Sequence, residues 1–170
     1  MVKKKYTIYE EEVILGEVSK YTNFAFGVGT PKLLKIITDK FRNFHFPNLI
    51  HPNATGDWAN INMGIGNIIT AGCSFTTDIE IGSFNLFNLN TTVGHDTIIG
   101  SYNIINPGVN VSGSVNVGII NLIGTGSTIL QEKTIGNHSI VGANSLVTKD
   151  IPDNVIAFGN PCKVIKENNK

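Results

Sequence analysis

Residues 81–118 read IGSFNLFNLNTTVGHDTIIGSYNIINPGVNVSGSVNVG, and an apolar residue stands at every sixth position of this stretch. Extended in both directions, the period covers fifteen positions without an insertion, all of them apolar and twelve of them β-branched. A longer period of 18 residues is also visible, because Ile81-Gly82 recurs as Ile99-Gly100 and again as Val117-Gly118. The fifteen positions are Met63, Ile69, Phe75, Ile81, Phe87, Val93, Ile99, Ile105, Val111, Val117, Ile123, Ile129, Ile135, Val141 and Val147.

A strict period of six fits neither an α-helix nor a simple alternating strand. It fits a short strand and a turn that return the same kind of side chain to the interior at each step. Three such steps close one coil, and successive coils stack as parallel strands. The fifteen positions therefore predict an all-β parallel β-helix of about five coils, with its core made mainly of Ile and Val.

Composition and charge limit the function. Of 170 residues, 13 are Lys or Arg and 13 are Asp or Glu, so the chain lacks the basic excess that nucleic-acid binding requires. Eight basic residues lie between Lys3 and Arg42, and the next one is Lys133. We find no apolar run long enough to span a membrane and no targeting signal. Cys73 and Cys162 have no metal or redox spacing, which favours free thiols and a cytoplasmic location.

Four further segments carry a family resemblance: Phe46–Ala54, Val93-Gly-His-Asp96, Asn106-Pro-Gly108, and Thr148–Pro152 leading to Gly159-Asn-Pro-Cys-Lys163. With the hexads, they resemble the hexapeptide-repeat acyltransferases, and within them the sugar O- and N-acetyltransferases related to sialic acid and bacillosamine acetyltransferases. The resemblance implies a left-handed helix, although handedness does not follow from the period itself. It also implies a homotrimer that uses acetyl-CoA and a nucleotide-linked sugar, without a metal. We expect a truncated α/β segment at 1–50, the β-helix at 51–152 and an extension at 153–170.

The candidate catalytic pair is His95 and Asp96. His95 follows an inward Val93 and Gly94, so we expect it on the outer surface near an edge of the prism. A neutral imidazole accepts a proton at physiological pH, and a neighbouring carboxylate can fix its tautomer. The resemblance implies that His95 is the general base and that Asp96 supports it. The alternative from the residues alone is an ordinary surface histidine in a turn.

The candidate cofactor groove lies in the last coils. Ile123-Gly-Thr-Gly126 and Val141-Gly-Ala-Asn144 are 18 residues apart, which predicts that Gly124 stacks under Gly142 and Thr125 under Ala143. Small residues allow the pantetheine arm of acetyl-CoA to approach the backbone. The resemblance implies cofactor contacts at Ile104, Thr125 and Ala143. Lys163 is a candidate partner for the phosphates, and the alternative is a solvated tail.

The N-terminal segment reads differently from the hexads. Residues 23–29 suggest a strand ending in a turn, and Thr30 and Pro31 are residues typical of a helix start. In the resembled family this is part of a small Rossmann-like domain that binds a nucleotide-linked sugar. Gly29 and Thr30 are therefore candidate ligands of the acceptor's diphosphate. Alternatively, the segment covers the open end of the prism.

Other function classes stay open at this point. An acyltransferase for another small acceptor, such as serine, would share the cofactor groove and differ only in the acceptor pocket. A non-catalytic β-helix scaffold is the second alternative. A metal-dependent carbonic anhydrase is disfavoured because no other histidine lies within 42 residues of His95, whereas such a site needs a close histidine pair.

Overall fold

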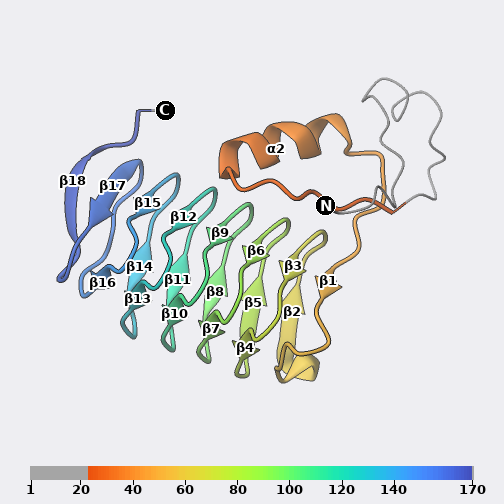
Figure 1. Cartoon of the computed structure of the whole chain (residues 1–170), viewed down its shortest axis with the longest axis horizontal. Helices are drawn as coiled ribbons and strands as arrows, with labels where there is room; N and C mark the ends of the chain where they lie inside the picture. The colour runs from red at the N-terminus through yellow and green to blue at the C-terminus, as the bar shows by residue number, and fades with distance from the viewer. Residues whose placement is uncertain (1–22, 170) are drawn as a thin grey trace, which may run out of the picture.

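Three parallel sheets form the faces of a prism of stacked coils (Figure 1), in a computed structural model that describes residues 23–169. Face I has the strand order β1-β3-β6-β9-β12-β15-β17-β18, face II the order β4-β7-β10-β13-β16, and face III the order β2-β5-β8-β11-β14. The chain passes from face I to face II to face III and back to face I, so each coil turns three corners. We name these corners I–II, II–III and III–I.

The strands are short, as a period of six requires. Their bounds are β1 Leu49–Ile50, β2 Ile61–Met63, β3 Ile68–Ile69, β4 Ser74–Phe75, β5 Ile79–Ile81, β6 Leu86–Phe87, β7 Thr92–Val93, β8 Ile98–Ile99, β9 Ile104–Ile105, β10 Asn110–Val111, β11 Asn116–Val117, β12 Leu122–Ile123, β13 Thr128–Ile129, β14 Thr134–Ile135, β15 Ile140–Val141, β16 Leu146–Val147, β17 Val155–Phe158 and β18 Lys163–Glu167. Within the described residues, the helices are α2 Pro31–Lys40 and the 3-10 turn η1 Trp58–Asn60.

The register confirms the predicted coil. Val93 pairs with Val111 and Ile99 with Val117, each 18 residues apart. Fourteen of the fifteen predicted inward side chains are buried, and only Met63, in the first coil, is half-buried. Strands β2 to β16 make the five expected coils, while β1 and β17 extend face I at the two ends.

A second inward series accompanies the apolar one, and the sequence analysis missed it. It repeats every sixth residue from Asn67 to Ile151, and its members are buried apart from the half-buried Lys133. At corner III–I the series consists of four asparagines, at positions 67, 85, 103 and 121, followed by Ser139, and the asparagines form a ladder. The side-chain oxygen of Asn85 accepts the backbone and side-chain N–H groups of Asn103, and that of Asn103 accepts the backbone N–H of Asn121. Buried amide groups can occupy the core because the hydrogen-bonding groups of each coil are paired with those of the next coil.

Helix α2 lies along corner III–I, above the coils (Figure 1). Leu34 is 4% exposed, and the ammonium of Lys35 lies 5.6 Å from the ring centroid of Tyr102. Tyr102 in turn stacks on Phe84 of the preceding coil, with ring centroids 5.4 Å apart. Three helical residues rise about 4.5 Å, close to the spacing of about 4.8 Å between coils, so the helix can repeat its contacts coil after coil.

The helix start expected at Thr30 and Pro31 is confirmed, but the strand expected at residues 23–29 is wrong. Residues 23–29 form no strand, and the only pairing is an isolated bridge between Asn23 and His45. Phe24 packs its ring against Phe44 instead, with centroids 4.7 Å apart, so aromatic packing replaces strand pairing. Thr30 does stand at the N-cap of α2, but its side chain makes no capping hydrogen bond. The part of the segment before residue 23 lies outside the described residues.

The C-terminal end closes face I differently from the coils. β17 continues the parallel ladder from β15, and β18 then returns antiparallel to β17. Cys73 and Cys162 are both buried and free, as expected. Within residues 23–169, no helix has the length and apolar character needed to cross a bilayer.

Candidate active site

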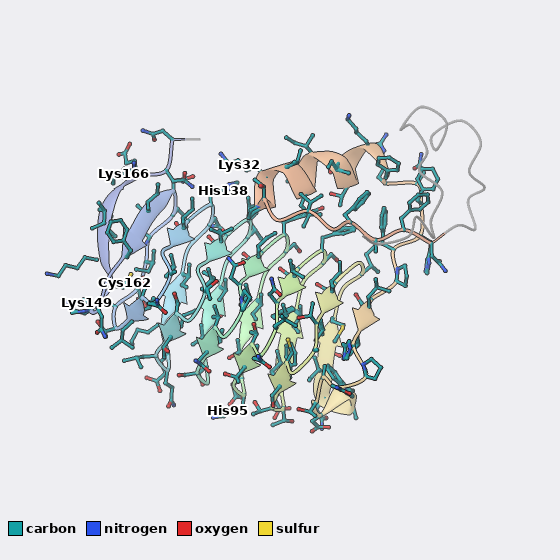
Figure 2. The ribbon with its side chains drawn as sticks, in the orientation of Figure 1. Lys32, His95, His138, Lys149, Cys162 and Lys166 are labelled. Atoms are coloured by element: carbon teal, nitrogen blue, oxygen red, sulfur yellow. The ribbon has the colours of Figure 1, made fainter. Side chains whose placement is uncertain are left out.

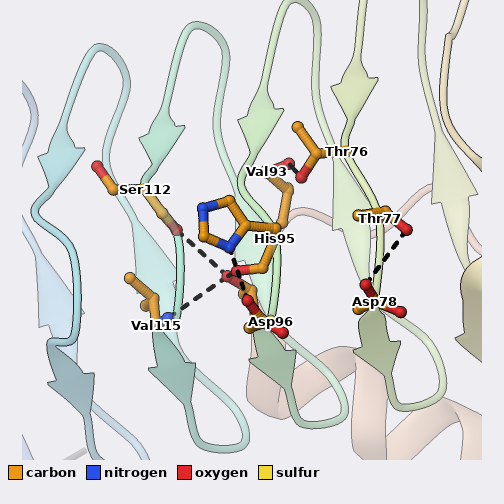
Figure 3. A network of polar contacts seen from close by, with 9 residues as sticks. Thr76, Thr77, Asp78, Val93, His95, Asp96, Ser112 and Val115 are labelled. Carbon is orange, nitrogen blue, oxygen red and sulfur yellow. Dashed lines mark hydrogen bonds and ion pairs between the residues drawn. The ribbon is translucent and has the colours of Figure 1, made fainter.

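His95 and Asp96 form the turn at corner II–III, between β7 and β8 (Figure 3). The Nδ1 atom of His95 lies 2.7 Å from a carboxylate oxygen of Asp96, and the two side chains are 53% and 63% exposed. Because a carboxylate only accepts, Nδ1 donates, and the lone pair of a neutral ring is then on Nε2. The pair presents a proton acceptor to solvent, with its tautomer fixed by the neighbour.

The backbone of the turn explains how adjacent residues can pair. Asp96 adopts a left-handed conformation with φ of 55°, which aspartate tolerates better than most residues. The same position is left-handed in the neighbouring coils, at Asp78 and Ser114. Asp96 therefore serves both the turn and the imidazole.

Gly113 provides the surface on which the imidazole rests, and the sequence analysis did not single it out. A Cβ atom at position 113 would lie 2.7 Å from Nε2 of His95 and 2.8 Å from Cε1. Gly113 follows His95 by 18 residues, which is one coil, so the 18-residue period alone could have placed Gly113 beside His95. The ring thus lies over the next coil toward the C-terminus, with its accepting nitrogen on that side.

The predicted cofactor residues lie at another corner. Gly124 and Thr125 follow β12, and Gly142 and Ala143 follow β15, so all four are at corner I–II. A Cβ atom at Gly124 would meet the backbone of Gly142 and Ala143, which confirms the predicted stacking. Thr125 and Ala143 are exposed. Face II separates this corner from the His95 corner of the same chain.

Lys163 lies beyond this small-residue column. It is exposed and pairs across β17 and β18 with Phe158, which is 48% exposed. A Cβ atom at Gly142 would lie 2.6 Å from the Cβ atom of Phe158, so Phe158 continues the corner I–II column. The sequence analysis missed Phe158 because the hexad period ends before it.

Ile104 is placed apart from the other predicted cofactor residues. It belongs to β9 on face I and is only 1% exposed. A side chain that is covered in this way offers no surface to a ligand, so it does not join the proposed site below.

Gly29 and Thr30 stand at the start of α2, beside a cavity of about 280 Å³. Ile120, Leu122 and Ile140 supply its apolar wall. Figure 2 places Lys32 and His138 at this edge and His95 at the opposite edge of the view. The structure therefore does not bring the predicted acceptor residues to the predicted base within one chain.

Cys162, near the C-terminal end of the fold, is a poor candidate nucleophile. Burial raises the pKa of the Cys162 thiol, which keeps it protonated and a poor nucleophile at neutral pH. No group of three or more His, Cys, Asp or Glu side chains suited to a metal ion occurs in residues 23–169.

Comparison with known proteins was made by sequence and by structure. No protein-family model matches the chain, and no curated protein matches it. PerB from Caulobacter crescentus, solved with CoA and GDP-perosamine, superposes with a TM-score of 0.82 and 31% identity, over 85% of this chain and 70% of PerB. The acetyltransferase domain of PglB from Neisseria gonorrhoeae, solved with acetyl coenzyme A, gives a TM-score of 0.86 and 29% identity, over 90% of this chain and 76% of that domain.

WeeI from Acinetobacter baumannii shares the fold, with a TM-score of 0.85 and 23% identity over 97% of this chain and 81% of WeeI. The stacked coils and the 31% identity to PerB assign the chain to the same protein family. The chain belongs to the hexapeptide-repeat, left-handed β-helix acyltransferases, in the group of sugar N-acetyltransferases.

Proposed function

We propose that this protein transfers an acetyl group from acetyl-CoA to an amino or hydroxyl group of a nucleotide-linked sugar, with His95 as general base. The observation that carries the proposal is the His95–Asp96 pair, exposed at a prism corner with Nδ1 held 2.7 Å from the carboxylate. Two relatives support the choice of ligands, because PerB was solved with CoA and GDP-perosamine and the PglB domain with acetyl coenzyme A.

His95 and Asp96 have separate roles in this mechanism. Nε2 of His95 removes a proton from the acceptor group as that group attacks the acetyl carbonyl, since a protonated amine or a neutral hydroxyl is a poor nucleophile. The acetyl C–S bond then breaks, and the departing CoA thiolate takes the proton from the imidazolium of His95. Asp96 holds the ring in the tautomer that leaves Nε2 free and stabilises the imidazolium that forms. When bound, acetyl-CoA supplies the activated acetyl thioester. Most of the acceleration comes from holding the two substrates together.

The residues of corner I–II fit acetyl-CoA. Gly124 and Gly142 let successive coils pack closely at this corner. The exposed Thr125 and Ala143 have short side chains, so an extended pantetheine arm can lie close to the backbone there. The ammonium of Lys163 stands beyond that column as a point charge for a phosphate. Each of these residues would bind and orient the cosubstrate without taking part in proton transfer.

The site is completed between copies of the chain. His95 is at corner II–III and the cofactor column is at corner I–II, so one chain alone does not bring them together. A head-to-tail ring of three chains places corner I–II of one copy against corner II–III of the next. We therefore propose a homotrimer with its active sites at the interfaces.

The acceptor is proposed to be an amino sugar linked to a nucleotide. Asp78 and Asp96 occupy equivalent positions in adjacent coils at the His95 corner, and no Lys or Arg occurs between Arg42 and Lys133. This acidic surface attracts a cationic amine. The diphosphate is assigned to Gly29 and Thr30 at the start of α2, whose first turn has no acidic residue.

The proposed location of the protein is the cytoplasm. The two free, buried cysteines support a reducing compartment.

The experiment compares the wild-type protein with His95→Ala in a thiol-release assay. The acceptors are nucleotide-linked amino sugars, free sugars and amino acids, with acetyl-CoA as donor. We expect turnover with a nucleotide-linked amino sugar, no turnover by His95→Ala, and unchanged acetyl-CoA binding by calorimetry. Full activity of His95→Ala contradicts the mechanism. Absence of acetyl-CoA binding at millimolar ligand supports a scaffold instead.

A further inference from the structure

Thr97 is a buried hydroxyl residue whose equivalents in the two adjacent coils are apolar. It belongs to the second inward series at corner II–III, one residue after the His95–Asp96 pair, and is 0% exposed. The equivalent residues of the adjacent coils are Ile79 and Val115, which are 1% and 0% exposed. Since valine has nearly the shape of threonine, packing at this position does not require a hydroxyl. Burial of a hydroxyl is unfavourable unless it forms hydrogen bonds, so the contacts of Thr97 indicate its use.

Those contacts join the turn of His95 to the next coil (Figure 3). The Oγ1 atom of Thr97 lies 3.4 Å from the carbonyl oxygen of His95 and 3.2 Å from that of Ser112, and its single proton can be donated to either. The same oxygen accepts the backbone N–H of Val115 at 3.4 Å. Ser112 directly precedes Gly113, on which the imidazole rests. Thr97 therefore connects the backbone that carries the ring with the backbone that supports it.

Thr91 provides an internal comparison at corner I–II. It is also 0% exposed, and its hydroxyl donates to the carbonyl of Asn88 at 2.7 Å and lies 3.4 Å from that of Asn106. Thr97 and Thr91 thus share a contact to the carbonyl 15 residues later, but the turn at Thr91 carries none of the proposed catalytic or binding side chains. Thr97 contacts the turn that carries His95, whereas Thr91 contacts a turn without a proposed catalytic or binding side chain. Thr91 is therefore a matched control.

We propose that Thr97 is a positioning residue for His95, an inference that rests on the proposed function. Its hydroxyl fixes the spacing between the His95 turn and the Gly113 turn, and thereby the position of Nε2 relative to the acceptor. General-base catalysis depends on that position to within a fraction of an ångström, whereas binding of acetyl-CoA at corner I–II does not. Loss of the hydroxyl is expected to lower kcat and leave the KM for acetyl-CoA unchanged.

The test uses Thr97→Val, Thr97→Ser and the matched control Thr91→Val in the full chain. We expect Thr97→Val to lower kcat about tenfold, while Thr91→Val stays within about twofold of wild type. Thr97→Ser retains the hydroxyl and is expected to restore most of kcat. Long-range ¹H–¹⁵N spectra of the histidine rings give an independent readout, since Thr97→Val is expected to shift the His95 nitrogen signals and Thr91→Val is not.

The outcomes separate this proposal from the proposed function. If His95→Ala is inactive and Thr97→Val is as active as Thr91→Val, the positioning role is wrong and the general base stands. If His95→Ala is fully active, the proposed function fails first. Equal loss of kcat in Thr97→Val and Thr97→Ser also contradicts a role for the hydroxyl. If Thr97→Val does not reach the native melting temperature, kcat is compared per folded protein at a temperature where both variants are folded, with the same spectra and the same criterion.

Discussion

The Nδ1 atom of His95 and a carboxylate oxygen of Asp96, its neighbour in the chain, lie 2.7 Å apart. Adjacent residues of an extended strand point to opposite faces, so such a contact needs a change of backbone direction. The left-handed φ of 55° at Asp96 supplies it. The charge that orients the imidazole and the turn that places it are therefore properties of one residue.

Substitutions of Asp96 can separate these two properties. Asn tolerates the left-handed region and keeps a side-chain oxygen for Nδ1, but it removes the charge. We expect Asp96→Asn to fold normally and to lower kcat about tenfold, less than the roughly 10²- to 10⁴-fold that general acid–base catalysis contributes, because His95 itself is retained. Asp96→Ala also meets the left-handed penalty of about 1 kcal/mol, so its melting temperature is expected to fall as well. An Asn variant with wild-type kcat contradicts the proposed role of the carboxylate.

Gly113→Ala is predicted to fold normally but to lower kcat. The φ of Gly113 is not left-handed, and the atoms closest to an added Cβ belong to the His95 ring, at 2.7 and 2.8 Å. The chain is therefore expected to fold with the ring displaced, and kcat to fall at least about tenfold because the base is misplaced. The control is the long-range ¹H–¹⁵N spectrum of the histidine rings. If Gly113 acts through the ring, Gly113→Ala shifts the His95 nitrogen signals, whereas a loss of kcat with unchanged His95 signals contradicts this account.

Much of the fold was predictable because the apolar hexads repeat without interruption, and Val93 or Ile99 is enough to set the register of its coil. The second inward series was not predictable in this way. Thr97 and Asn103 are polar, and the sequence does not reveal that each is bonded to the next coil. The site was predictable only in part. The 18-residue period places Gly124 beside Gly142 and puts His95, 30 residues before Thr125, at another corner, but it does not show that the imidazole of His95 lies over Gly113.

Asn103 is predicted to be important for stability rather than for chemistry. Its side-chain oxygen accepts the backbone N–H of Asn121 at 2.9 Å, and its amide donates to the carbonyl of Gly118 at 2.9 Å. Asn103→Ala leaves both buried groups unsatisfied, which is expected to cost about 2–4 kcal/mol of unfolding free energy. Denaturant unfolding measures the loss. The activity per folded protein is expected to stay near wild type, and an unchanged unfolding midpoint contradicts the ladder's role.

Acid stability is predicted to depend on Asp153. Hydrogen bonds from the backbone and side chain of Asn137 lower the pKa of this carboxyl below its ordinary value of 3.8. A lowered pKa means that the native state binds the proton less readily than the unfolded chain. The stabilisation of the native state by ionised Asp153 is therefore fully present above pH 3.8 and is lost as the pH falls through the lower native pKa. Asp153→Asn should be less stable than wild type at pH 7, with the difference shrinking below pH 4. Melting temperatures measured across that range test this, and a constant difference contradicts it.

Complementation between two inactive variants tests whether the site is shared by two copies. His95→Ala removes the base at corner II–III, and Ala143→Trp fills the exposed cofactor column at corner I–II. Each variant is expected to be inactive alone. In mixed trimers, one interface in about four combines an intact His95 corner with an intact cofactor corner, so co-expression at equal levels is expected to restore about a quarter of wild-type activity. Co-expression of His95→Ala with Asp96→Ala serves as the control, because both substitutions are at the same corner and no interface joins two intact parts. If Ala143→Trp and His95→Ala assemble together without recovering activity, the site does not lie between copies of the chain.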